Sequence, residues 1–177
     1  MRPGSLCVGV LVALLLAGCS GAPRAPAPVA AVPTSPSAPS APSITTAPVA
    51  GRLTHAQAND VTLTAIGLVG TPYRYGGNTP DSGFDCSGLI GYVYKERAAL
   101  VAPRTTAGLM DWGSSIAPAD LRSGDVVVFV QNGRATHAGI FVGEGRFVHA
   151  PSTGGTVRLD HLKTPYWARQ QVIYRRP

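Results

Sequence analysis

Apolar residues recur at helical spacing at the start of the predicted folded domain. Residues 59–69 carry such a pattern up to Gly70, which predicts a first helix. A second helix is predicted over residues 86–97, where the apolar positions lie on one face: Leu89, Ile90, Val93 and Tyr94. A third, short helix is predicted to begin at Thr105, as its cap, and to end near Gly113.

After Pro118 the pattern changes to β-branched runs separated by glycine-rich turns. Five strands are predicted, over residues 126–130, 137–142, 146–150, 156–159 and 168–174. Helices that precede a set of strands indicate an α+β domain, not alternating βαβ units with a parallel sheet. The fold expected for residues 53–177 is therefore N-terminal helices packed on a five- to six-stranded antiparallel sheet with one core.

Residues 19–52 differ from this domain in composition. Eight of the 16 prolines fall here, among Ala, Ser and Thr, and Arg24 is the only charge before Arg52. Prolines lack an amide donor and fix φ, so we expect a disordered or polyproline-like tether in place of packed elements. At ~3.1 Å per residue, such a tether reaches roughly 90 Å when fully extended.

Residues 1–18 have the pattern of a secretory signal peptide, with Arg2 followed by a short apolar run. The last residues, Leu16-Ala17-Gly18, and the following Cys19 resemble the lipobox of bacterial lipoproteins. That resemblance implies cleavage before Cys19 and lipid on its sulfur; the alternative is an ordinary signal peptide with a chance cysteine. Ser20 is not the Asp associated with inner-membrane retention, so we expect a lipid anchor in the outer membrane facing the periplasm.

The formal net charge is +6, and the basic residues are spread singly along the chain. Only Arg175 and Arg176 are adjacent, and no basic run is interleaved with aromatic residues. This distribution argues against nucleic-acid binding. It suits anionic polymers or membranes of the cell envelope without selecting one partner.

Cysteine usage indicates one free thiol in the exported protein. Cys7 leaves with the signal peptide and Cys19 is consumed by lipid, so Cys86 has no intrachain partner for a disulfide. Cys86 falls in the first turn of a predicted helix behind the cap Asp85, where the helix dipole favours a thiolate. The sequence predicts a nucleophile; the alternative is a small buried core cysteine.

A cysteine nucleophile needs a base, and two of the four histidines belong to one predicted hairpin. A three-residue loop over 143–145 would pair Val142 with Arg146 and place His137 and His149 diagonally on one face. A two-residue loop would separate them onto opposite faces. The alternatives are bystander histidines, or a zinc site with Cys86, which the absence of closely spaced ligand pairs disfavours.

Together these residues resemble the NlpC/P60 cysteine peptidases of bacterial cell walls. The matching segments occur in the family's order and extend over essentially the whole domain: residues 70–77, 85–89, 103–105, 123–126, 137–141 and 147–150. The resemblance implies a papain-like α+β core. It also implies hydrolysis of peptidoglycan stem peptides, usually between γ-linked D-glutamate and a diamino acid such as meso-diaminopimelate.

The resemblance assigns roles to individual residues as well. Cys86 would be the nucleophile, His137 the base and His149 the polar residue that orients it. Tyr73 would line the site near the oxyanion. The residues flanking the cysteine, Asp85 and Ser87, would hold the N-terminal side of the substrate, with helix capping as the alternative for Asp85. We expect a monomer that needs no metal or cofactor.

Two other functions remain open from the sequence. One keeps the thiol chemistry but changes the bond, as in an N-acetylmuramoyl-L-alanine amidase or a lipid acyltransferase of the same superfamily. The other is a catalytically silent lipoprotein that binds or regulates the wall. The intact Cys86, His137 and His149 argue against the silent protein.

Overall fold

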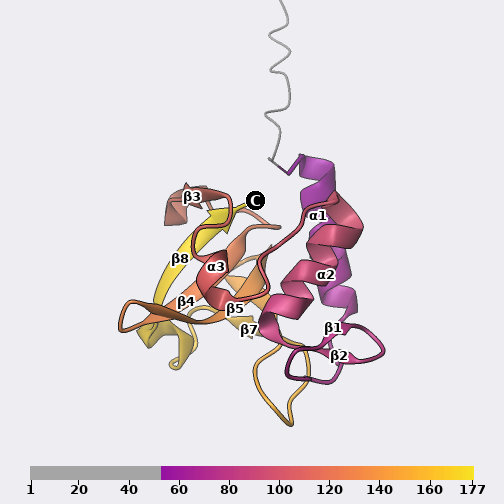
Figure 1. Cartoon of the computed structure of the whole chain (residues 1–177). Coiled ribbons are helices and arrows are strands. Elements are labelled where there is room, and N and C mark those ends of the chain that lie inside the picture. The colour runs from indigo at the N-terminus through magenta and orange to yellow at the C-terminus, as the bar shows by residue number, and fades with distance from the viewer. Residues whose placement is uncertain (1–52) are drawn as a thin grey trace, which may run out of the picture. The chain divides into compact units, whose positions relative to one another are not determined.

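Helices and sheet form two layers in the computed structural model, which describes residues 53–177. The predicted signal peptide, Cys19 and the tether lie outside the described residues. Helices α1 (His55–Gly67) and α2 (Cys86–Ala98) lie side by side, and α3 (Thr106–Leu109) lies near β5 (Figure 1). No helix within the described residues is long and apolar enough to cross a membrane.

The main sheet has six antiparallel strands in the order β3-β8-β4-β5-β6-β7. Their bounds are β3 Ser114–Ile116, β4 Val126–Gln131, β5 Arg134–Gly143, β6 Arg146–His149, β7 Arg158–His161 and β8 Gln171–Arg176. A separate two-stranded ribbon joins β1 (Asn78–Thr79) to β2 (Gly83–Phe84), and two 3₁₀ turns are η1 (Pro118–Asp120) and η2 (Trp167–Arg169). The α+β class and the antiparallel sheet are thus confirmed.

The element bounds depart from the sequence prediction where caps and side-chain contacts decide them. Helix α1 begins four residues earlier than expected because Thr54 and Gln57 form a reciprocal capping box. The last predicted strand starts at Gln171, since residues before it form η2. Strand β3 was missed altogether, as its three residues are largely exposed and carry no alternating pattern.

The core lies on both faces of the sheet. The face toward α1 and α2 buries a large cluster that includes Val61, Leu89, Val93, Val128 and Ile140. The opposite face buries a second, aromatic cluster made of Val127, Phe129, Phe141, Phe147 and Trp167. Strand β4 is buried on both sides through Val130, which explains its unbroken β-branched run.

The β5–β6 hairpin has the register expected beyond its turn, but the turn itself differs from the prediction. The turn has two residues, Glu144 and Gly145, both with positive φ, and Gly143 pairs with Arg146. The expected pairing of Val142 with Arg146 is therefore wrong. A bulge between Phe141 and Gly143 adds the missing residue, so Phe141 pairs with Phe147 and both catalytic-candidate histidines share a face.

Candidate active site

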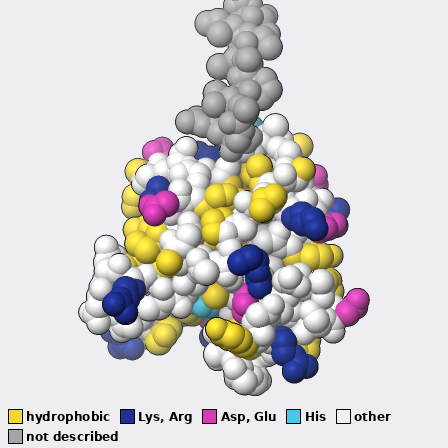
Figure 2. Space-filling model, viewed as in Figure 1, with side chains coloured by type: hydrophobic (Ala, Val, Ile, Leu, Met, Phe, Trp, Pro, Cys, Tyr) yellow, Lys and Arg dark blue, Asp and Glu magenta, His cyan; other side chains and the backbone are white. Residues whose placement is uncertain are grey.

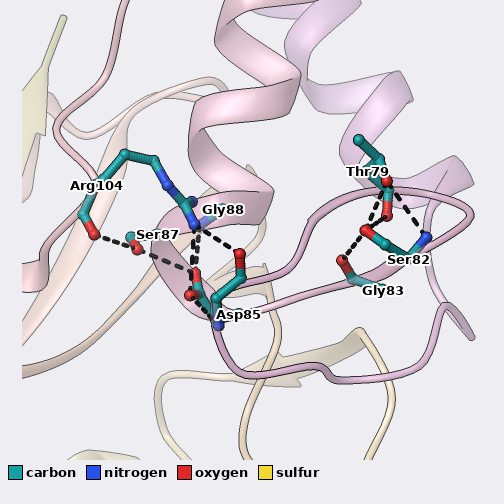
Figure 3. Close-up of polar contacts among 8 residues, drawn as sticks. Thr79, Ser82, Gly83, Asp85, Ser87, Gly88 and Arg104 are labelled. Carbon is teal, nitrogen blue, oxygen red and sulfur yellow. Dashed lines mark hydrogen bonds and ion pairs between the residues drawn. The ribbon is translucent and has the colours of Figure 1, made fainter.

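Asp85 caps α2, as the sequence predicts. Its Oδ1 accepts hydrogen bonds from the Gly88 amide at 2.6 Å and the Ser87 hydroxyl at 3.0 Å (Figure 3). Its Oδ2 accepts one from the Gly76 amide at 2.9 Å and lies 3.5 Å from Nη2 of Arg104. Asp85 is thus the N-cap of α2, and both of its carboxylate oxygens have partners within the protein.

Ser87 is buried, and its hydroxyl lies 2.9 Å from the backbone carbonyl of Arg104. This contact fixes the segment before α3 against the start of α2 (Figure 3). Substrate contacts by Asp85 and Ser87 stay predictions.

Cys86 is the first residue of α2 and is half-buried. Burial raises the pKa of its thiol, and the carboxylate of Asp85 raises it further. Backbone N–H groups of Ser87, Ala138 and Cys86 itself lower the pKa but do not outweigh the first two causes. The expected thiolate is therefore wrong for the free protein: the thiol is protonated and needs a base.

Tyr73 is close enough to this thiol for the charge of Cys86 to affect the pKa of its phenol. Burial raises the pKa of its phenol, followed by the charges of Cys86 and Asp85. The backbone amide of Tyr73 donates to the Gly155 carbonyl at 2.8 Å, and Tyr73 bridges to Phe84 just before the helix. The structure thus brings Tyr73 to the thiol as a protonated hydroxyl that can donate a hydrogen bond.

The two hairpin histidines are in direct contact. Nε2 of His137 lies 2.8 Å from Nδ1 of His149, with the ring planes at 82°. His149 is fully buried over Gly139, where an added Cβ would lie 3.1 Å from the Cβ of His149. Trp167 stacks on His137 at a centroid distance of 5.5 Å and meets His149 edge to face at 5.2 Å. The same-face prediction for the pair is confirmed.

A carboxylate that sequence reasoning missed completes this row of side chains. Oδ2 of Asp160, on β7, lies 3.0 Å from Nε2 of His149 and accepts from Nε1 of Trp167 at 2.9 Å. Arg158, two residues earlier on the same face, pairs with the same oxygen at 2.9 Å. The alternation of polar Arg158 and Asp160 around Leu159 was the available signal, once β6 and β7 were known to pair.

Both imidazoles are neutral at physiological pH. Burial lowers the pKa of His137 to about 3, assisted by the neighbouring His149 and Arg158. Burial also lowers the pKa of His149 to about 4, although its hydrogen bond to Asp160 acts in the opposite direction. A neutral imidazole has a lone pair that can accept a proton, as a general base must.

The thiol and His137 approach each other where α2 meets β5. The Ala138 amide, adjacent to His137 in the chain, is near enough to the thiol to lower its pKa. Within residues 53–177, no hydrogen bond joins the thiol to the imidazole in the free site. Catalytic hydrogen bonds are often long before substrate binds, so this geometry suits a nucleophile and base.

A cleft of about 420 Å³ lies next to His137 on the aromatic side of the sheet. Its lining includes Phe129, His137, Arg158, Tyr166 and Trp167, and Cys86 lies outside it. No group of three or more His, Cys, Asp or Glu within the described residues is arranged to hold a metal ion.

The fold and this site define an α+β domain with a thiol at the start of a helix, close to the strand of an antiparallel sheet that carries one of two paired histidines. Comparison with known proteins identifies the family. Residues 70–176 match the NlpC/P60 family, and the chain belongs to it.

Curated relatives share this domain. The chain is 40% identical over 112 residues to "Murein DD-endopeptidase MepH" of Escherichia coli K12, a match covering 61% of this chain and 41% of that protein. It is 38% identical over 110 residues to "Gamma-DL-glutamyl hydrolase" of Bacillus subtilis 168, covering 61% and 26%. The chain thus spans less than half the length of these two relatives.

Solved structures agree on the fold. The NlpC/P60 domain of the peptidoglycan hydrolase SagA matches with a TM-score of 0.58 and 28% identity, covering 66% of this chain and 96% of that one. An NlpC/P60 family protein from Bacillus cereus matches with a TM-score of 0.63 and 28% identity, covering 67% and 39%.

Proposed function

We propose that this protein is a cysteine endopeptidase that hydrolyses peptidoglycan stem peptides through Cys86, His137 and His149. The observation that carries the proposal is the hydrogen-bonded pair of His137 on β5 and His149 on β6, with the neighbouring Ala138 amide of β5 close to the thiol. Membership of the NlpC/P60 family supports it, as do relatives named as murein and glutamyl hydrolases. A thiol with a raised pKa and a neutral imidazole fit activation by proton transfer.

The proposed reaction proceeds through a thioester. His137 takes the proton of Cys86 as the sulfur attacks the scissile carbonyl, and His149 keeps the imidazole oriented. The Cys86 amide and the Tyr73 hydroxyl stabilise the developing oxyanion, at roughly 3 kcal/mol for each good donor. His137 then gives its proton to the leaving amine, and water activated by the same imidazole releases the acyl group.

The proposed bond joins γ-linked D-glutamate to a diamino acid such as meso-diaminopimelate. The similarity to the gamma-DL-glutamyl hydrolase supports it. The similarity to the murein DD-endopeptidase of Escherichia coli K12 favours a second candidate, a bond between two D-configured residues.

Defined muropeptides distinguish these bonds. The purified protein would be incubated with monomeric and cross-linked muropeptides, and the products identified by mass spectrometry. We expect products ending in L-Ala-D-Glu from the monomer; conversion of cross-linked dimers alone would select the DD bond. Removal of the whole peptide from the glycan would instead show an amidase.

Variants of the proposed triad test the roles. We expect Cys86→Ala to abolish cleavage and retain the fold, and full activity in this variant would overturn the proposal. His149→Ala should reduce kcat/KM less than His137→Ala, because orientation is easier to replace than proton transfer. Equal losses would contradict the roles of the two histidines.

We further propose that lipid on Cys19 anchors the enzyme to the outer membrane, with the catalytic domain facing the periplasm. The lipobox-like Leu16-Ala17-Gly18 before Cys19 supports this, together with Ser20 after it. Labelled palmitate should enter the wild-type protein but not a Cys19→Ser variant, which retains Cys7 and Cys86. Equal labelling of the two proteins would refute acylation at Cys19.

A further inference from the structure

The row of hydrogen bonds that begins at His137 ends on one carboxylate oxygen. Oδ2 of Asp160 receives Nε2 of His149 at 3.0 Å, Nε1 of Trp167 at 2.9 Å, and Nε and Nη2 of Arg158 at 3.1 and 2.9 Å. Burial raises the pKa of Asp160, but hydrogen bonds from Trp167 and His149 and the charge of Arg158 leave it below its ordinary value. The carboxylate is therefore ionised and can only accept hydrogen bonds.

An acceptor at the end of the row decides where each imidazole carries its proton. His149 is neutral, and Nε2 must hold its single proton because that nitrogen faces Asp160. Nδ1 of His149 is then a bare acceptor, so the 2.8 Å bond to His137 requires the proton on Nε2 of His137. The remaining nitrogen, Nδ1 of His137, is left with a free lone pair.

We propose that Asp160 is a positioning residue that fixes the tautomers of both histidines and leaves Nδ1 of His137 free to accept the Cys86 proton. Asp160 acts through His149 and does not line the cleft beside His137. The inference rests on the proposed function for the roles of Cys86 and His137. The assignment of the tautomers rests only on the contacts that run from His137 through His149 to Asp160.

A merely structural Asp160 is the competing explanation. The same carboxylate ties β7 to the 3₁₀ turn η2 through Trp167, and its loss would loosen that contact. Such loosening would lower stability and activity together. It would leave the histidine tautomers and the pH dependence of the thiol unchanged, so these two readouts separate the explanations.

Asn at position 160 separates orientation from charge. All the donors converge on one oxygen, and Trp167 and Arg158 cannot accept a hydrogen bond. An Asp160→Asn side chain would therefore place its carbonyl oxygen there, which retains the tautomers but removes the negative charge. Asp160→Ala removes both.

Glu144→Gln is the matched control. It deletes one negative charge from the turn of the β5–β6 hairpin, where Glu144 is exposed and, among residues 53–177, forms an ion pair with Arg146 alone. Neither the tautomers nor the reactivity of the thiol should change in this variant.

Ring ¹⁵N–¹H correlation spectra of the full protein report the tautomers directly. We expect protons on Nε2 of both His137 and His149 in the wild type and in Asp160→Asn, and mixed tautomers in Asp160→Ala. A proton on Nδ1 of either ring in the wild type would overturn the proposal. If Asp160→Ala fails to fold, the wild-type and Asp160→Asn spectra still decide the assignment.

The rate of alkylation of Cys86 by iodoacetamide tests the charge without any peptidoglycan substrate. The charged groups facing the imidazoles are Asp160 and Arg158; near the thiol lie the carboxylate of Asp85 and the titratable but neutral phenol of Tyr73. The carboxylate of Asp160 favours the imidazolium form, so Asp160→Asn should slow alkylation at neutral pH about tenfold, equivalent to one pKa unit. At strongly alkaline pH, where hydroxide ionises the thiol without help from the imidazole, the rates should converge with the wild type.

Cleavage kinetics complete the test. Asp160→Ala should lower kcat on the order of ten- to a hundredfold with little change in KM, within the range for a misplaced general base. Alkylation rates that are equal in wild type and Asp160→Asn at every pH would leave Asp160 a structural residue and refute the proposal. If peptidoglycan is not cleaved but the tautomers and alkylation follow expectation, the substrate assignment fails and the positioning role stands.

Discussion

A buried ion pair attaches the last strand to the turn before β4, and its removal provides a stringent test of how this fold is held. Asp125 is fully buried, and its two oxygens accept from Nε and Nη2 of Arg176, each at 2.8 Å. The backbone amide of Arg122 donates to Oδ2 at 2.9 Å. Asp125 therefore closes the turn over 122–125 and joins it to the end of β8.

Asp125→Ala should destabilise the domain by about 4 kcal/mol. Removing one partner of a buried pair costs about 3–5 kcal/mol, because the other charge is left uncompensated. The side chain of Arg176 is only 17% exposed, so water can replace little of the lost carboxylate. The orphaned amide of Arg122 adds to the cost, although contributions within one network do not sum independently.

Thermal and urea unfolding followed by circular dichroism measure the effect. For a domain of this size, about 4 kcal/mol lowers Tm by roughly 15 °C. Asp125→Asn retains an acceptor oxygen and should be less severe. The control is Glu144→Gln, whose exposed partner is Arg146; such a pair is worth under about 1 kcal/mol. A loss below 1 kcal/mol in Asp125→Ala would refute the argument that burial makes the pair essential.

Three further expectations concern the candidate site. Gly139→Ala should lower kcat/KM at least about tenfold, since its Cβ would lie 2.8 Å from the Phe147 ring and displace His149; unchanged kinetics would contradict this. Tyr73→Phe should lower kcat about a hundredfold, with KM retained, if its hydroxyl serves the oxyanion. In the folded protein the pKa of each histidine lies below its ordinary value of 6.5. The stability that the two histidines contribute is therefore complete above pH 6.5 and is lost as the pH falls towards 4. His149→Gln should flatten this pH dependence of Tm.

Local patterns were sufficient to predict much of this fold. The β-branched run of β4 and the helical spacing of apolar residues after Asp85 each arise because a single element buries its own residues in the core. The charge distribution was equally readable from sequence, and on the face shown in Figure 2 the Lys and Arg side chains are scattered without a continuous patch. These features depend on neighbours along the chain, so one sequence contains their signal.

Features that depend on distant pairing were missed or reached by a wrong argument. Strand β3 exists because Ser114–Ile116 pairs with β8, some sixty residues later, and its own residues carry no alternation. Asp160 joins the histidine row only because β7 pairs with β6. The prediction of a thiolate at Cys86 considered only the helix dipole, which lowers the pKa of a thiol. Burial and the adjacent carboxylate of Asp85 raise that pKa and outweigh the dipole.

The hairpin bulge shows how one backbone irregularity connects fold to chemistry. With the observed two-residue turn and no bulge, His149 would point toward the helix layer, away from His137 and Asp160. The extra residue before Gly143, whose φ is 99°, restores the register and places both rings in the aromatic layer with Trp167. Burial there keeps both rings neutral, and Asp160 is the carboxylate whose charge raises the pKa of each of them. The carboxylate that fixes the tautomers is thus also the group placed to stabilise an imidazolium formed during the proposed reaction.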